Sequence, residues 1–588
     1  MLGYTTFFSY TEVNAQGERE FAVCTREFLR RIRAYNNAVS FTSLGAKIDD
    51  TITNNAHNVY TMRVHGEVWH RVGSLLPEEG QRPQYAQVWM YDGDDLLNAQ
   101  QENIRDLDRE VLQLLNQLLL RHNPYARLFK NAAQRMMVDE NARVHLRMLD
   151  PTTHDPRRYN RPTVEEIGGI IIGDEMGGDQ LNPTRDIIIE RLQHAGGHRY
   201  QRISELNPSY FPLRYPFMFL YGEQGWHTSI PLANVDLARN PELMAYRQAN
   251  LAPDVQVDEE NEAENEDVRR GVAGSLRVSQ AQFYNYHLQR RQEFSPLQWA
   301  GRLLQEMIID AWVCVESNRL QFQRSNQVKL RADLYSGLQD AMAGGVEDNV
   351  EQLGRQIILA SSFIGGPRHM RQQYQDAMAI CRHFGKPDFF VTFTCNPQWK
   401  EIQDTLYPGQ KAEDAPHIVS RVFHLKLHSL LDDLNKRDVL GKVKAFVYTI
   451  EFQKRGLPHA HILIILDDHH KITSVEDIDN CISAELPDQN VDPELYSIVK
   501  TNMIHGPCTP QRCVVNGRCK KRYPKQWANE TLWHEDGYPV YRRRNDGKTV
   551  QARGAVFDNR SVVPYNPYLS KRYKAHINVE VHLRSLNC

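Results

Sequence analysis

The sequence has few cysteines, no long apolar run and no leader-like segment, and each of these absences excludes a class of protein. Nine cysteines in 588 residues are too few for a framework of disulfide bonds, and they favour a reduced, intracellular setting. No apolar stretch approaches the roughly 18 residues that suggest a membrane span. The amino-terminal segment does not place a basic region before an apolar one, as a secretory signal does. We therefore expect an intracellular protein with no membrane partner.

The sequence also lacks a GxxxxGK[ST] loop, which excludes a nucleotide-binding site of that type. Its formal net charge of −3 conceals an uneven distribution. Residues 500–588 contain 17 Lys and Arg against 6 Asp and Glu, so a basic segment follows an acidic remainder. Clustered basic residues are the usual electrostatic sign of nucleic acid binding. A positive surface that is merely solvated is the alternative.

The length predicts about four domains, and the composition indicates where they are divided. The clearest division is Asp254–Asp267, which has eight acidic residues, no basic residue and no aromatic one, as expected of a solvated linker. We predict four structured segments and one linker. The structured segments are a mixed α and β region at 1–155, a β-rich region at 156–250, a domain of helices and strands at 279–480 and a basic Cys/His region at 481–588. The acidic linker occupies 251–278.

Periodicity predicts the elements of the 279–480 segment. Apolar side chains from Leu304 to Val315 recur at helical spacing. Further helices are expected at His369–His383 and Val419–Leu434, with a strand at Phe389–Cys395 between them and a hairpin after them. This order predicts an α+β fold, in which an antiparallel sheet has helices on one face.

Expectations for the amino-terminal half are coarser. The runs AQVWMY (86–91), GGIIIG (168–173) and DIIIERL (186–192) predict strands. Leucines recurring within Asn103–Leu120 predict a helix. No chemistry follows from these patterns.

Two histidines, one residue apart, begin a strongly apolar run. His459 and His461 lie in the stretch AFVYTIEFQKRGLPHAHILIIL. Because side chains alternate faces along a strand, both imidazoles project from one face and can share a divalent metal ion. Glu451 and Gln453 end the preceding run and also share a face, so they meet the imidazoles across the hairpin if Lys454–Pro458 is the turn. A histidine pair without a ligand near a sheet edge is the alternative.

Several segments resemble the Helitron helicase-like family, the rolling-circle replication initiators of Helitron transposons. FFVTFTCNPQWKEI (389–402) and EFQKRGLPHAHILIIL (451–466) are similar to the first two Rep motifs of that family. The resemblance implies that residues 279–480 form a Rep domain of the HUH type. Similar segments occur along nearly the whole chain, at 32–45, 73–92, 361–380, 503–508, 537–544 and 562–580.

The resemblance implies a metal-dependent chemistry. In such enzymes two histidines and a third polar ligand hold Mg²⁺ or Mn²⁺, which polarises a phosphate of single-stranded DNA. A tyrosine hydroxyl then attacks, leaving a 5′-phosphotyrosine and a free 3′-OH. By the resemblance, His459 and His461 are the ligand pair, Gln453 is the first choice for the third ligand and Glu451 is the second. It also implies a nuclear location, with single-stranded DNA as the partner.

The sequence departs from the family pattern after its HINVE segment. Family members have a YxxxY pair there, whereas Tyr565, Tyr568 and Tyr573 are spaced differently. The family also has a carboxy-terminal helicase, whose nucleotide-binding loop is missing from this sequence. We therefore expect an amino-terminal portion of a Helitron protein that is truncated before its catalytic tyrosines, and no catalytic tyrosine is assigned.

A second group of metal ligands follows the hairpin. His505, Cys508, Cys513 and Cys519 are four ligands within 15 residues, enough to close a tetrahedral zinc shell; unligated loop thiols are the alternative. Basic residues interleaved with aromatic ones follow, and we expect them to contact DNA. They are Lys520, Lys521, Arg522, Arg542, Arg543 and Arg544.

Three functions stay open on these observations. The leading one is the nicking and joining of single-stranded DNA by a Rep-type region of a Helitron transposon protein. The alternatives are a non-catalytic remnant that binds single-stranded DNA, and a metal-dependent hydrolase that works without a tyrosine intermediate. No pattern in the sequence indicates an oligomeric state.

Overall fold

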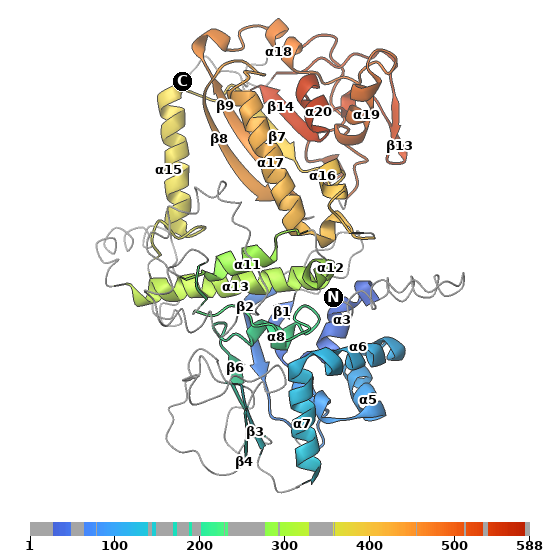
Figure 1. Cartoon of the computed structure of the whole chain (residues 1–588). Coiled ribbons are helices and arrows are strands. Elements are labelled where there is room, and N and C mark those ends of the chain that lie inside the picture. Colours follow the sequence, from blue (N-terminus) through green and yellow to red (C-terminus); the bar gives the residue numbers. More distant parts are fainter. Residues whose placement is uncertain are drawn as a thin grey trace. The chain divides into compact units, whose positions relative to one another are not determined.

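The structure is a computed structural model, and its described residues form two compact units, one up to Leu320 and the other from Gln321 onward (Figure 1). The acidic stretch expected to be a linker lies outside the described residues, and the five segments expected from the sequence stay predictions. The structure describes residues 28–48, 64–77, 79–138, 144–148, 169–172, 187–190, 201–228, 230–232, 277–291, 295–327, 357, 359–407, 409–453, 456–510, 513–532 and 539–581.

The amino-terminal unit contains helices and two antiparallel sheets, with strand orders β1-β2-β6 and β4-β3-β5. The strands expected from GGIIIG and DIIIERL are confirmed as β4 and β5. The strands are β1 (Ser43–Ile48), β2 (Val64–Val72), β3 (Val144–Met148), β4 (Gly169–Ile172), β5 (Ile187–Glu190) and β6 (Gln201–Ile203). The helices are α3 (Ile32–Val39), η1 (Tyr85–Met90), α5 (Gly93–Asn103), α6 (Arg109–His122), α7 (Pro124–Val138), α8 (Tyr210–Arg214), α11 (Gln280–His287), α12 (Pro296–Trp299) and α13 (Arg302–Ser325).

The AQVWMY run forms the 3₁₀ helix η1, so the strand expected there was wrong. Val88, Trp89 and Met90 are consecutive and all buried. A strand would have turned the middle one of the three away from the core. The tighter helical turn buries all of them, and the indole N–H of Trp89 donates to the carbonyl of Val39.

The leucine-rich helix α6 begins at Arg109, six residues later than the start expected from the sequence. Asp108 is its N-cap, because its carboxylate accepts hydrogen bonds from the backbone N–H groups of Glu110 and Val111. The residues before the cap belong to the end of α5 and to a turn.

Helix α13 completes the core of the amino-terminal unit. Leu304, Met307, Ala311 and Val315 are buried along one side of it, which confirms the expected apolar stripe. They pack in one cluster with apolar side chains from α3, α6, α7 and α8. The helical stripe that the sequence placed in the 279–480 segment therefore belongs to the core of the amino-terminal unit.

Two acidic side chains of α13 are buried with partners from distant segments. Glu306 forms an ion pair with Arg214 at 2.7 Å, and these side chains are only 4% and 2% exposed. The carboxylate of Asp310 faces Nε2 of His70 at 2.7 Å and accepts a hydrogen bond from the hydroxyl of Tyr215 at 3.0 Å. Both contacts join α13 to segments that precede it by nearly a hundred residues or more.

The carboxy-terminal unit is built on a four-stranded antiparallel sheet with the order β14-β7-β9-β8. The expected strand at Phe389, the helix at His369 and the helix at Val419 are confirmed. The sheet strands are β7 (Phe389–Thr394), β8 (Val443–Phe452), β9 (Pro458–Leu466) and β14 (His576–Val581). The helices are α15 (Pro367–Phe384), α16 (Lys400–Gln403), η4 (Ala412–Asp414), α17 (Pro416–Asn435), η5 (Asp468–His470), α18 (Val475–Cys481), α19 (Pro493–Asn502), η6 (Asn559–Ser561) and α20 (Pro567–Tyr573). Two short hairpins pair β10 (Val514–Val515) with β11 (Arg518–Cys519) and β12 (Val550–Ala552) with β13 (Ala555–Phe557).

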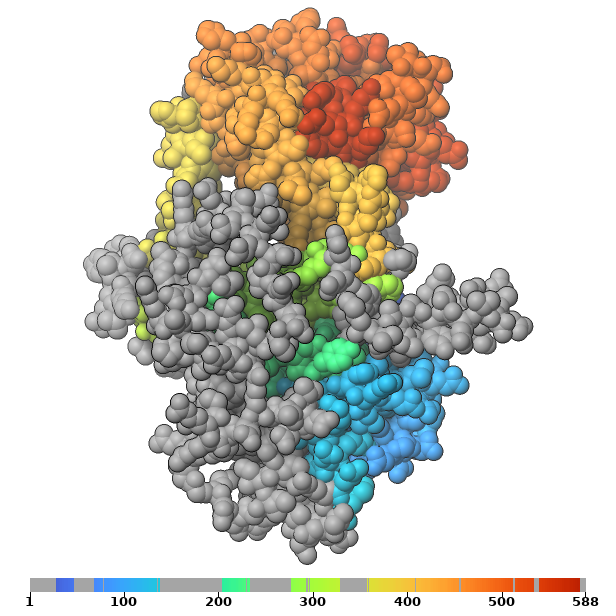
Figure 2. Space-filling model, viewed as in Figure 1, coloured from blue at the N-terminus to red at the C-terminus, as the bar shows by residue number. Residues whose placement is uncertain are grey.

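The two faces of this sheet have different environments. On one face, alternate apolar residues of β7, β9 and β14 are buried against α17, and Phe393 stacks on Phe423 of that helix. Figure 1 shows α17 lying along the strands, and the space-filling view from the same side shows side chains filling this region (Figure 2). The intervening residues of the same strands point to the second face and are only half-buried. This alternation leaves one face of the sheet available for polar chemistry, and the fold is α+β, as expected.

Within the described ranges, no helix combines the length and the apolar character that crossing a membrane requires.

Candidate metal centre

The register of the sheet brings the two histidines and an acidic side chain together on the half-buried face. His459 and His461 alternate with buried Pro458, Ala460 and Ile462 along β9. Across the hairpin, Glu451 is the partner of His459 in β8. The hairpin therefore places one carboxylate opposite the imidazole pair.

The three side chains converge on one point. Nε2 of His459 lies 3.0 Å from Nε2 of His461, and the Glu451 carboxylate lies 3.6 and 3.7 Å from these two atoms. Two neighbouring ligands of an octahedral ion are about 3.0 Å apart when each is about 2.1 Å from it. The imidazole separation fits that value, and the exposed glutamate needs only a small rotamer adjustment. The residues thus fit a divalent cation.

The site is accessible from the solvent. The side chains of His459, His461 and Glu451 are 13%, 30% and 61% exposed, respectively. A cation and a phosphate can therefore reach the two imidazoles, which would not be possible if apolar side chains covered them.

The environment of His459 keeps its imidazole neutral. Burial lowers the pKa of His459, and the neighbouring His461 and Lys521 lower it further against the opposing effect of Glu451. A metal ligand must be the neutral imidazole, so this shift favours metal binding at neutral pH.

Two residues of β7 hold the ring of His461. Oγ1 of Thr392 lies 3.2 Å from Nδ1 of His461, and Phe390 stacks on the imidazole at 5.3 Å with the planes 9° apart. A histidine that donates its Nδ1 proton to an outer partner presents its Nε2 lone pair to a metal. Sequence reasoning did not single out these two residues, although Phe390 and Thr392 alternate with buried positions just as the histidines do.

We expect the Thr392→Val substitution to weaken Mn²⁺ binding by about 10-fold, the lower end of the effect of losing such an outer partner. Valine keeps the shape of threonine but cannot accept the Nδ1 proton. Titration of the protein with Mn²⁺, followed by electron paramagnetic resonance of the free ion, measures the change. Thr449→Val is the matched control, because Thr449 is opposite His461 on the other neighbouring strand, β8. An equal loss in both variants would contradict a role specific to Thr392.

Glu451, the second choice from the sequence, is the acidic group that faces both histidines. The first choice, Gln453, lies just beyond the end of β8, where its backbone N–H donates to the carbonyl of Leu457. A ligand role for the Gln453 amide stays a prediction.

Strand β14 extends the polar face on the far side of β7. His576 is opposite Thr394, which is in turn opposite His459, and Asn578 is opposite Thr392. Nδ1 of His576 faces the carbonyl of Asn502 at 2.8 Å. A continuous row of polar side chains thus crosses the sheet from β8 to β14.

The second predicted ligand group is also brought together. Nε2 of His505 lies 3.3 Å from the sulfur of Cys519 and 3.7 Å from that of Cys513. With Cys508 included, one ligand atom from each residue lies within 4.8 Å of all the others. The four side chains that the sequence grouped by spacing therefore form one cluster.

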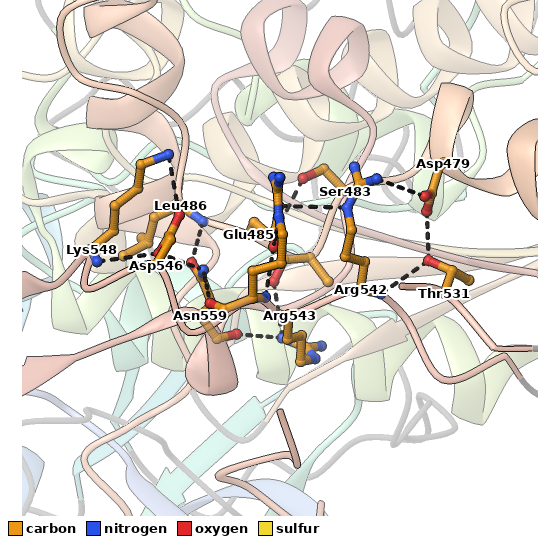
Figure 3. A network of polar contacts seen from close by, with 12 residues as sticks. Asp479, Ser483, Glu485, Leu486, Thr531, Arg542, Arg543, Asp546, Lys548 and Asn559 are labelled. Atoms are coloured by element: carbon orange, nitrogen blue, oxygen red, sulfur yellow. Dashed lines mark hydrogen bonds and ion pairs between the residues drawn. The ribbon is translucent and has the colours of Figure 1, made fainter. Parts of the chain in front are cut away.

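The three arginines expected to contact DNA have partners within the protein (Figure 3). Arg543 is 3% exposed and donates to the carbonyls of Ala484, Asn559 and Val562. This differs from the expected DNA contact, because a buried guanidinium with three acceptors has no route to a phosphate.

The neighbours of Arg543 are also paired. Arg542 donates to Asp479, and Arg544 forms a two-point contact with Glu485. Figure 3 shows the Arg542–Asp479 pair and the Thr531–Asp479 hydrogen bond as parts of one polar network. The network joins the segment at Arg542 to α18, which contains Asp479, and to the residues that follow this helix. These arginines therefore have a structural role.

Lys520, Lys521 and Arg522 are exposed, as a DNA-contacting group must be. Burial lowers the pKa of His505, and the charge of Lys521 lowers it further. The charge of Lys521 also lowers the pKa of His459. It therefore favours the neutral imidazole in both ligand groups. Of the interleaved aromatics, Tyr523 stacks on His505 at 4.3 Å; Trp533 and Tyr538 lie outside the described residues.

Comparison with protein families places part of the chain in a known domain family. Residues 283–464 match the Helitron helicase-like domain at N-terminus. The match confirms the resemblance over this range, which includes both histidines of the metal centre, and it supports a Helitron transposon protein. The comparison with curated proteins gives no match.

Proposed function

We propose that the carboxy-terminal unit is the metal-binding part of a Rep-type HUH site that nicks and joins single-stranded DNA. The observation that supports this most strongly is the convergence of His459, His461 and Glu451 on an accessible, polar face of an antiparallel sheet. Mg²⁺ or Mn²⁺ bound there would polarise a phosphate of the DNA.

The residues of the chain have distinct tasks in this proposal. His459, His461 and Glu451 hold the ion, and Thr392 fixes the tautomer of His461. The exposed Lys521 neutralises phosphate charge of the DNA, which is the usual contribution of a lysine to binding single strands.

The hydroxyls of several tyrosines are engaged elsewhere, which favours a second candidate. Tyr565 donates to the carbonyl of Glu485, Tyr573 donates to Asp433, and Tyr541 accepts a bond from the N–H of Val581. These hydroxyls are hydrogen-bonded within the protein and are not presented to a DNA phosphate. Metal-dependent binding of single-stranded DNA without cleavage is therefore the second candidate.

One assay distinguishes the candidates. The chain is incubated with end-labelled single-stranded DNA in Mn²⁺ or in EDTA, and binding, nicking and a covalent protein–DNA band are measured. Nicking with a covalent band supports the Rep-type site, nicking without one supports a hydrolase that uses water, and Mn²⁺-dependent binding alone supports the binding function. If Mn²⁺ changes neither binding nor cleavage, the proposed metal centre is wrong.

A further inference from the structure

The loop after α19 is folded so that its three cysteines meet. Asn516 and Gly517 both have positive φ, at 51° and 74°, as required by the two-residue turn that closes a tight hairpin. This hairpin pairs β10 with β11, and the N–H of Lys520 donates to the carbonyl of Cys513. Cys513 and Cys519 are thereby held at the base of the hairpin, side by side.

The fourth side chain is brought to them from the end of α19. The backbone N–H of His505 donates to the carbonyl of Ser561 at 2.8 Å, which fixes the start of the loop. The face of its ring packs against Tyr523 at 4.3 Å. The imidazole is thus locked from two sides with Nε2 directed at the thiols.

The separations fit a tetrahedral ion. A nitrogen about 2.05 Å and a sulfur about 2.3 Å from zinc lie about 3.6 Å apart at the tetrahedral angle. The two separations from His505 Nε2, 3.3 Å to Cys519 and 3.7 Å to Cys513, lie on either side of that value. A ligand set of one nitrogen and three sulfurs is one of the common closed zinc shells.

We infer that His505, Cys508, Cys513 and Cys519 form a structural zinc site, which fixes the loop that carries the exposed Lys520, Lys521 and Arg522. Lys521 follows Cys519 by two residues, and so the position of its backbone is set by the shell.

Zinc content tests the site without any reference to DNA. The chain, purified without chelators, should contain about one zinc per molecule by elemental analysis, and Cys513→Ser should lose it. Cys381→Ser, a thiol on α15 outside the group, is the matched control and should keep the metal. Should Cys513→Ser not fold, Co²⁺ exchanged into the unmodified chain should give the visible absorption typical of tetrahedral thiolate coordination. Absence of bound zinc together with absence of that absorption overturns the inference.

The position of Lys521 has a separate test, which rests on the proposed function. Lys521→Gln should lower the affinity for single-stranded DNA and reduce the slope of log affinity against log salt by about 0.7. Lys571→Gln is the control, because Lys571 already pairs with Asp492 at 2.7 Å. An unchanged slope in Lys521→Gln overturns the placement of this lysine against DNA. A zinc-loaded chain without Mn²⁺-dependent DNA binding would instead refute the proposed function and leave the zinc site standing.

Discussion

Replacing His459 with alanine should weaken Mn²⁺ binding by at least about 100-fold and remove every Mn²⁺-dependent interaction with single-stranded DNA. His459 supplies one of the three protein ligand atoms proposed for the ion. The loss of even an outer partner of a ligand typically weakens metal binding by about 10–100-fold. Mn²⁺ titration followed by paramagnetic resonance, and binding and cleavage of labelled DNA in Mn²⁺ and in EDTA, measure the two effects.

The control for this experiment is His469→Ala. His469 is an exposed histidine of η5 in the same unit, and its replacement should change neither quantity. DNA binding in EDTA should survive in both variants, since it depends on basic residues such as Lys521. Equal Mn²⁺ affinity in His459→Ala and in the unmodified chain would show that the imidazole pair is not a metal site.

The position of the histidines could be predicted from the sequence because it depends only on local geometry. The period of two in β9 puts His459 and His461 on one face whatever the strand pairs with. Ala460, which lies between them, and Ile462, which follows His461, are fully buried and join the strand to α17 through the core. The same local reasoning holds for α17 and for the stripe on α13.

The choice of third ligand depends on the register, which the local sequence does not give. Gln453 and Glu451 share a face, so periodicity alone cannot separate them. The structure pairs Glu451 directly with His459 and places Gln453 beyond the last residue of β8, beside the turn. One carboxylate therefore lies within reach of both imidazoles because of how the hairpin closes.

Partners distant in sequence explain the remaining differences. The acceptors of Arg542 and Arg544, which are Asp479 and Glu485, precede them by about sixty residues, and Arg543 is buried among carbonyls from both earlier and later segments, so the run of three arginines does not reveal these partners. Likewise, Glu306 and Asp310 interrupt the apolar face of α13, where a buried acid requires a charged or hydrogen-bonding partner. That interruption was a usable signal, but the sequence does not identify Arg214 and His70 as the partners.

The second large effect is expected at this buried ion pair. Glu306→Leu should destabilise the amino-terminal unit by about 3–5 kcal/mol, because it leaves the guanidinium of Arg214 buried without its carboxylate. Arg214 keeps Asn37 and Ser40 as acceptors at 2.6 and 3.3 Å, but neither is charged. Urea-dependent hydrogen exchange of peptides from α8 and α13 measures the stability of this unit separately from the other.

A double variant separates the loss of the pair from the loss of packing. Arg214→Met combined with Glu306→Leu removes both charges, and it should recover most of the stability, because buried pairs are often replaced by apolar residues at little cost. Glu316→Leu, at a partly exposed position of the same helix, should change the stability by no more than about 0.5 kcal/mol. If Glu306→Leu is as mild as this control, the ion pair does not hold α13 in place. If it is severe and the double variant recovers, α13 depends on Arg214, a residue outside the Helitron helicase-like match at 283–464, and a fragment confined to that match would lack the partner of Glu306.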